Sequence, residues 1–481
     1  MSGYVKVFDF TKVGTLMSDE DVTQFVRPWL QHAPPPPPRG NNLYDAFISY
    51  RSSDRAWAMA LYDVLKLAGW QAFLDQYDLV PGGNLETSLT EGLEASSAGV
   101  ILWSGRTKDS KWCERERNAM RALREQRNRT FNYIFAKLDA EELPLFARSD
   151  LYVSFEESPE GPRGVNLLKL MCGMRGIALP PDAVVMAQQV DAEAKQAMIQ
   201  INGAIEAGNA AKLLKIGTSA HPGLLALPGP ILATAQGLTR LGRYDDARTV
   251  LKRALLLFPQ SVRARQLEGL ALRRLKKYQE AVDVLSELKA EGHQDPETLG
   301  ILAAAKDGLF RETGKMLHLR NARELYRTAF QGDPKDYYTG INAASKSLFL
   351  GEPAEAARLA GEVLPLVEKA IDGKDLWSAC TLGEVYLLQG KVDEAVAQYQ
   401  KVIDNNPNAS GDTHTTVAGI EKKKSKAKKR QVAEVADKRP SSARTIMVVN
   451  DGPSTIAPPP TRLSFASIIS GQLVRDLLNL H

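Results

Sequence analysis

Cysteine, histidine and long apolar runs are scarce in this 481-residue chain, and each scarcity excludes a class of protein. The three cysteines, Cys113, Cys172 and Cys380, lie far apart without a metal-ligand spacing, so we expect reduced thiols and no disulfide framework. The six histidines are also scattered, which argues against a metal site. No stretch approaches the roughly 18 apolar residues of a membrane span, and residues 1–9 lack the pattern of a secretory signal. We therefore expect a cytoplasmic protein with no membrane partner.

An excess of charge of one sign is missing too. The chain has 61 Lys and Arg against 57 Asp and Glu, which gives a formal net charge of +4. For a chain of this length, that charge is too small to attract nucleic acid or other polyanions in general. The basic block at residues 422–430 is typical of a solvated, disordered segment, so nucleic acid is not an expected partner. The length exceeds what one core supports and predicts two to four domains.

Strand and helix patterns alternate between residues 41 and 179. The pattern predicts strands at residues 45–49, 70–74, 99–103 and 133–138, and helices at 54–69, 85–97 and 112–126. Alternation with short loops predicts a parallel sheet with helices on both faces. Ligands of such sheets bind beyond the carboxyl ends of the strands. Ser49, Tyr50, Arg51, the loop from Asp75 and residues 104–111 fall at those ends.

Trp112 and Glu116 lie one helical turn apart, so their side chains share one face of the predicted helix. An aromatic plate beside a carboxylate can hold a flat heterocycle and stabilise a positive charge that develops next to it. The ordinary alternatives are a solvated carboxylate for Glu116 and a core position for Trp112. Glu114 falls on the opposite side of the helix. Cys113 has no histidine nearby in the sequence, so we reject a cysteine nucleophile.

Residues 44–155 resemble a TIR (Toll/interleukin-1 receptor) domain. Three motifs carry the resemblance: Tyr44-Asp45-Ala46-Phe47-Ile48-Ser49-Tyr50, Phe73-Leu74-Asp75 before a Pro-Gly loop, and Ser110-Lys111-Trp112-Cys113-x-x-Glu116. The resemblance implies a flavodoxin-like sheet that self-associates, often through the family's BB loop, which corresponds here to Pro81, Gly82, Gly83 and Leu85. In the enzymatic branch it also implies cleavage of NAD between nicotinamide and ribose. That branch carries its catalytic glutamate four residues after a tryptophan.

Site roles follow from this resemblance. Glu116 is then the catalytic residue, and Trp112 is a stacking wall for the substrate. Ser49, Tyr50, Arg51 and Asp75 are the expected substrate-binding residues at the strand ends. Arg51 either binds the diphosphate by charge-assisted hydrogen bonds or faces water, and Asp75 either contacts substrate or caps its loop. NAD is the substrate in this interpretation, and neither a cofactor nor a metal is expected.

From about residue 181 to 407 the composition shifts to Ala, Leu, Lys and Glu with helical periodicity. Gly242-Arg243-Tyr244-Asp245-Asp246-Ala247 recurs 34 residues later as Lys276-Lys277-Tyr278-Gln279-Glu280-Ala281. Ala322 and Ala356 are again 34 residues apart, and Ala395 follows one unit on, with insertions before Ala322 and before Ala395. The pattern resembles the tetratricopeptide repeat (TPR), whose period is 34 residues and whose small alanine lets two helices cross closely. Residues 321–355 also look like the helical domain joined to some kinases as a TRAF-binding region.

The chain thus divides into an N-terminal preface (1–33), a proline-rich linker (34–40), a TIR domain (41–179), a helical linker (180–228), TPR-like repeats (229–407) and a basic, largely disordered tail (408–481). The preface is either a docking element or a terminal cap. The predicted fold is multidomain: an α/β flavodoxin-like domain with a parallel sheet, followed by an all-α TPR-like superhelix.

The resemblance favours an NAD⁺ glycohydrolase gated by self-association of the TIR domain. Its product is ADP-ribose or a cyclic ADP-ribose, and the repeats bind a protein or peptide partner as a sensor. This layout suits immune signalling, such as prokaryotic antiphage defence. The alternative is a non-enzymatic TIR adaptor that signals by TIR–TIR and TPR–protein contacts.

Overall fold

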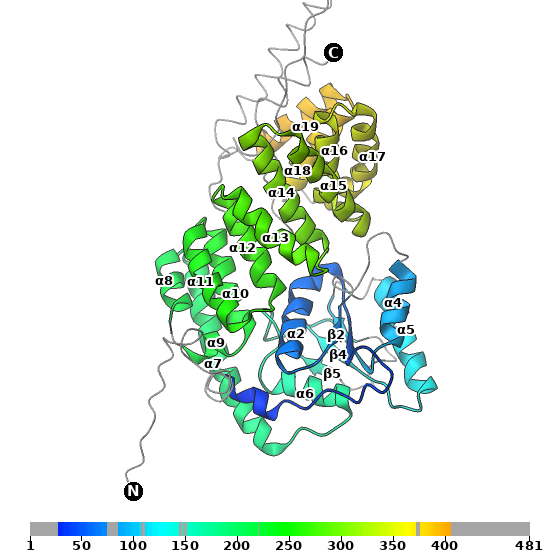
Figure 1. Ribbon diagram of the computed structural model, residues 1–481, viewed down its shortest axis with the longest axis vertical. Coiled ribbons are helices and arrows are strands. Elements are labelled where there is room, and N and C mark those ends of the chain that lie inside the picture. Colours follow the sequence, from blue (N-terminus) through cyan, green and yellow to red (C-terminus); the bar gives the residue numbers. More distant parts are fainter. Residues whose placement is uncertain are drawn as a thin grey trace, which may run out of the picture. The chain divides into compact units, whose positions relative to one another are not determined.

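The computed structural model describes residues 27–74, 85–105, 107, 111–143, 147, 152–219, 221–371 and 376–405. The chain forms two compact units. The first comprises Met1–Leu275 with Ala290–His293, and the second comprises Lys276–Lys289 with Gln294–His481. An α/β domain and the helices that follow it belong to the first unit, and the second is helical in its described residues (Figure 1).

The α/β domain is built on a five-stranded parallel sheet in the order β2-β1-β3-β4-β5. The strands are β1 (Ala46–Ser49), β2 (Ala72–Phe73), β3 (Ala98–Trp103), β4 (Asn132–Lys137) and β5 (Tyr152–Ser154). Every residue of β1 and β3 is buried, as expected of central strands covered on both faces. The strand order reverses between β1 and β3, which is the switch point of a flavodoxin-like sheet. The predicted fold class of this part is confirmed.

Helices α2 (Arg55–Leu67), α4 (Leu85–Glu94), α5 (Lys111–Gln126) and α6 (Gly164–Arg175) accompany the sheet. The apolar face predicted for the first of them is buried, with Trp57, Leu61 and Val64 at most 5% exposed. Aromatic rings dominate the core, and Phe47 of β1 stacks on Phe73 of β2 with ring centroids 5.1 Å apart. The short strand β5 and helix α6 were not predicted individually. The three residues of β5 are too few to show the period of two that marks a strand.

The described part of the segment before the sheet, residues 27–45, is packed within the first unit. Trp29, in the 3₁₀ helix η3 (Pro28–His32), is 2% exposed, and its indole N–H donates to the carbonyl oxygen of Ala226 at 3.2 Å. The described end of the preface therefore packs on the helical part of the same unit, near Ala226. The prolines are not a free linker either, because Pro34 is buried and its carbonyl accepts a hydrogen bond from Trp70 Nε1 at 3.1 Å.

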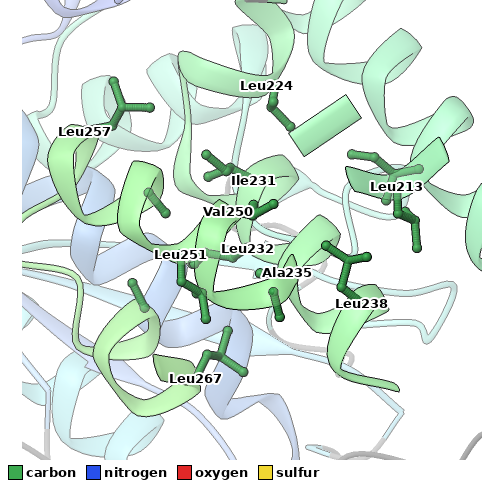
Figure 2. Close-up of a cluster of buried hydrophobic side chains, with 14 of the residues drawn as sticks. Leu213, Leu224, Ile231, Leu232, Ala235, Leu238, Val250, Leu251, Leu257 and Leu267 are labelled. Carbon is green, nitrogen blue, oxygen red and sulfur yellow. The ribbon is translucent and has the colours of Figure 1, made fainter. Parts of the chain in front are cut away.

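Residues 180–228, which the sequence-based division names a helical linker, are helical and pack into a hydrophobic core. They form α7 (Pro181–Glu206), α8 (Ala210–Gly217) and α9 (Pro222–Leu225). Ile201, Leu213 and Leu224 from these three helices are fully buried in one hydrophobic cluster with the helices that follow. Figure 2 shows Leu213 and Leu224 in this cluster. The sequence of α7 does not reveal its packing in the core, because its buried face is rich in alanine. Small residues give a weak apolar period although they allow helices to pack closely.

The remaining helices follow the repeat predicted from the 34-residue spacing. They are α10 (Pro228–Arg240), α11 (Tyr244–Leu257), α12 (Val262–Arg274), α13 (Tyr278–Ala290), α14 (Pro296–Thr313), α15 (Met316–Gly332), α16 (Tyr337–Phe349), α17 (Pro353–Ala370), α18 (Leu376–Leu388) and α19 (Val392–Asn405). The second helix of each pair carries the predicted alanine, and all five alanines are 0% exposed: Ala247, Ala281, Ala322, Ala356 and Ala395. None of the helices in the described ranges has the length and apolar character needed to cross a bilayer. The basic tail lies outside these ranges.

Four helix pairs use a left-handed residue two positions after their first helix ends. Three of these residues are glycines, with φ of 72° at Gly242, 80° at Gly351 and 75° at Gly390. Lys276 takes the same place between α12 and α13 with φ of 60°. A side chain at such a φ is strained, since Cβ approaches the backbone.

We expect Lys276→Gly to stabilise the chain by roughly 0.5–1 kcal/mol, because relief of the left-handed strain exceeds the entropy that glycine loses on folding. Gly242→Ala, at the equivalent turn, should destabilise by roughly 1 kcal/mol. Urea unfolding followed by circular dichroism measures both changes. An unchanged or lower urea midpoint for Lys276→Gly would contradict the inferred backbone strain at Lys276.

Candidate active site

Ser49 and Glu116 meet at the carboxyl edge of the sheet. Ser49 is the last residue of β1, and its hydroxyl donates to Glu116 Oε2 at 2.5 Å although the two residues are 67 positions apart. The serine is 1% exposed and the glutamate is half-buried. A short hydrogen bond to a carboxylate is a strong one and fixes its orientation. The geometry holds one carboxylate at the place where parallel sheets bind ligands.

The helix α5 brings Glu116 to this edge through its apolar face. Met120, one turn after Glu116, is 0% exposed, and Leu123 is 8% exposed in the same core. Residues four apart share a helix face, so Glu116 lies on the side that packs on the sheet. Glu114 lies elsewhere on the helix, is 60% exposed and pairs with Arg117 at 3.6 Å. The structure therefore distinguishes the two carboxylates.

A second polar network joins the loops after β1 and β3. The carboxylate of Asp54, just before α2, accepts from the Ser104 hydroxyl at 2.7 Å and from the Thr107 hydroxyl at 3.3 Å. All three residues are at most 4% exposed. Sequence reasoning placed residues 104–111 at this edge but missed these three side chains. The only signal for them was that polar residues directly follow two buried strands.

The loop after β3 is also held from the side of β4. The Asp139 carboxylate accepts from the backbone N–H of Gly105 at 2.9 Å and from that of Glu141 at 3.0 Å. Asp54 and Asp139 thus fix neighbouring residues of the same loop from two strands. This loop precedes α5 in the chain.

The other predicted site residues are placed only in part. Tyr50 is buried and Arg51 is half-buried directly after β1. Trp112 lies in the first turn of α5 and Leu85 begins α4, but their side chains fall outside the described part of the structure. Asp75 and the loop residues Pro81, Gly82 and Gly83 also lie outside the described residues.

The main chemical feature of the described part of the site is the Glu116 carboxylate at the carboxyl edge of the sheet. Among the described residues there is no group of three His, Cys, Asp or Glu side chains that could hold a metal ion. The Ser49–Glu116 pair suits the stabilisation of a positive charge on a bound molecule, since a fixed carboxylate needs little reorganisation when that charge appears.

Three family models match parts of the chain. Residues 46–168 match the family model of the TIR domain, residues 241–349 match the model named Tetratricopeptide Repeats-Sensor, and residues 381–409 match a tetratricopeptide repeat model. The chain contains a TIR domain followed by TPR-type repeats. The TIR match begins at the first residue of β1 and ends within α6, so it includes the complete sheet.

Curated relatives are similar over shorter stretches. A probable 2′ cyclic ADP-D-ribose synthase, BdTIR of Brachypodium distachyon, is 35% identical over 79 residues, which are 16% of this chain and 35% of that protein. The NAD(+) hydrolase PdTIR of Paracoccus denitrificans is 28% identical over 105 residues, 22% of this chain and 35% of that protein. The chain therefore spans about a third of the length of these relatives.

Similar solved structures are TPR proteins. The thermophilic TPR protein TTC0263 of Thermus thermophilus is 25% identical, with 40% of this chain and 97% of that chain covered and a TM-score of 0.34. MamA of Desulfovibrio magneticus RS-1 is 23% identical, with 37% and 97% covered and a TM-score of 0.31.

Asp54→Ala should destabilise the TIR domain by about 1–3 kcal/mol, because the buried Ser104 hydroxyl loses its carboxylate acceptor, whereas the Thr107 hydroxyl keeps the carbonyl of Leu102. Asp54→Asn keeps an acceptor oxygen and should cost less than half as much. Thermal unfolding of the full chain, compared with the exposed-site variant Glu125→Gln, measures the difference. Equal effects of the two Asp54 variants would show that the network contributes no acceptor-dependent stability.

Proposed function

We propose that this protein is an NAD⁺ glycohydrolase whose TIR domain cleaves the bond between nicotinamide and ribose. The observation that carries the proposal is the Glu116 carboxylate, held by Ser49 at 2.5 Å at the switch point between β1 and β3. The TIR match over residues 46–168 and the names of the curated relatives support the same chemistry. Glu116 also stands four residues after Trp112, as in the enzymatic branch of the family.

The reaction makes modest demands on the protein. The C1′–N1 bond breaks with its electron pair moving to the nicotinamide ring, which leaves as a neutral molecule. The ribose then carries an oxocarbenium-like charge, and the Glu116 carboxylate stabilises that charge or orients the ribose hydroxyls. Attack by water with loss of a proton gives ADP-ribose, whereas attack by a hydroxyl of the same molecule gives a cyclic ADP-ribose. No general acid is needed for a neutral leaving group.

The neighbouring residues have supporting roles in this proposal. Ser49 orients the Glu116 carboxylate toward the ribose by donating to Oε2. Arg51, directly after β1, binds the diphosphate by charge-assisted hydrogen bonds. Trp112 stacks on a ring of the substrate, and Asp75 contacts it from the neighbouring strand end. No cofactor or metal ion takes part.

Assembly and sensing complete the proposal. The TIR domain self-associates through the loop at Pro81, Gly82, Gly83 and Leu85, and a neighbouring copy completes the site. The TPR-type repeats bind a protein or peptide partner, in keeping with the sensor name of the family model that residues 241–349 match. Immune-type signalling, including antiphage defence in the cytoplasm, fits an enzyme that consumes NAD on demand.

Glu116→Gln should lower nicotinamide release from NAD by at least about 100-fold, because the amide cannot stabilise the oxocarbenium charge. Ser49→Ala should lower it by about tenfold, since the carboxylate remains but loses its fixed orientation. Full-length protein is assayed over a range of concentrations by chromatography of nicotinamide and ADP-ribose.

Glu114→Gln is the matched control, because Glu114 is an exposed carboxylate in the same helix turn. It should keep full activity. A folded wild-type protein that releases no nicotinamide at any concentration would instead favour the non-enzymatic adaptor. Equal loss in both glutamate variants would remove Glu116 from its assigned role.

Gly82→Pro tests the assembly step. A proline in this loop restricts its backbone, so we expect activity to lose its steep dependence on protein concentration and to fall to the level of dilute wild type. Light scattering measured beside the activity assay reports self-association. Wild-type activity and association in this variant would exclude the loop from the assembly mechanism.

A further inference from the structure

One buried contact joins the TIR domain to the repeats within the first unit. Asp63 of α2 and Ser261, the N-cap residue of α12, are 198 positions apart, and the Ser261 hydroxyl donates to Asp63 Oδ2 at 2.6 Å. Asp63 is 6% exposed and Ser261 is 2% exposed. Ser261 Oγ also accepts from the backbone N–H of Ala264 at 3.3 Å, which caps the helix. The hydroxyl therefore serves α12 and the TIR domain at once.

Charged side chains of α2 and α12 act on the contact between Asp63 and Ser261. Lys66 lies one turn after Asp63 in α2, and both Lys66 and Arg265 of α12 act electrostatically on the Asp63 carboxyl. Arg265 forms a bidentate ion pair with Glu291, with N–O distances of 2.7 and 2.6 Å, and Glu291 lies 3.8 Å from His293.

Asp63 is the group of this cluster that changes charge near neutral pH. Burial raises the pKa of its carboxyl to about 7, against the lowering effects of the Ser261 hydrogen bond, Lys66 and Arg265. The Arg265 hydrogen bond lowers the pKa of Glu291, which is therefore ionised in that range. Burial and Arg265 lower the pKa of His293 to about 4, so this imidazole is neutral.

We propose that Asp63 and Ser261 form a proton-linked latch that holds helix α2 of the TIR domain against helix α12 of the repeats. With a proton on Asp63, the contact is a hydrogen bond between two neutral groups that bury easily. Without it, closing the contact buries a charge whose cationic neighbours compensate only in part. Binding of a partner that displaces α12 must also break this contact, so the repeats and the TIR domain are coupled through it.

The direction of the pH effect follows from linkage. In the open contact Asp63 faces water and has an ordinary carboxyl pKa of 3.8, whereas in the closed contact its pKa is about 7. The closed form therefore binds the proton more tightly, and the proton-linked stabilisation is complete only below the lower value. It is lost as pH rises through about 7, and the closing equilibrium should be about tenfold more favourable at pH 6 than at pH 8.

Hydrogen–deuterium exchange of the full chain tests this latch without reference to NAD cleavage. After correction for the intrinsic exchange rate, amides in α2 and in the first turns of α12 should open about tenfold more often at pH 8 than at pH 6. Asp63→Asn mimics the protonated acid and keeps an acceptor for Ser261. Its opening should change less than twofold over the same range.

Two further variants guard the interpretation. Glu125→Gln removes an exposed carboxylate from α5 and should keep the full tenfold dependence. Ser261→Ala should open more often at every pH yet keep or steepen the dependence, because the hydroxyl that lowered the Asp63 pKa is gone. A pH-independent wild type, an Asp63→Asn variant that keeps the dependence, or a flat Ser261→Ala variant would each overturn the latch. NAD cleavage can fail independently of all three results.

Discussion

The parallel pairing of β1 with β3 is the constraint on which the candidate site depends. Ser49 pairs in register with Ile101, so both strands end at one edge and their loops meet there. Gly99 of β3 is part of the same constraint, because a Cβ at this position would lie 2.7 Å from Met120 Sδ. The missing side chain lets α5 pack closely on the sheet. Glu116, one turn before Met120, is thereby brought within reach of Ser49.

The TIR domain is packed as part of a larger unit. Helices α7–α9 share a hydrophobic cluster with α10–α12, and Leu67 at the end of α2 packs against that cluster. Helices α9 and α7 approach each other closely at Gly223, where a Cβ would lie 2.1 Å from the backbone oxygen of Glu193. Trp29 adds a hydrogen bond from the preface to Ala226. Cutting the chain at residue 179 would therefore expose apolar and polar surfaces that the intact unit buries.

The sequence predicts what local periodicity controls. Strand β3 and the buried face of α2 follow from their apolar patterns, and Ala247 and Ala281 follow from the 34-residue spacing. Contacts between distant segments leave no such trace. The bond from Ser49 to Glu116 depends on the approach of α5, and the bond from Asp63 to Ser261 spans 198 positions. The family resemblance predicted that the end of β1 and the start of α5 share a site. The residue pattern of 180–228 did not predict a packed core.

Helix α2 connects the two polar centres of the first unit. It begins after Asp54, which binds Ser104 beside the candidate site, and it carries Asp63 against the repeats. Nine residues of α-helix span about 13 Å, a distance that a packed helix crosses as a rigid body. In the proposed latch, a shift of α12 that pulls on Asp63 would also move Asp54, which binds Ser104 directly after β3. Coupling between repeats and site needs no long chain of side chains, because one helix takes part in both contacts.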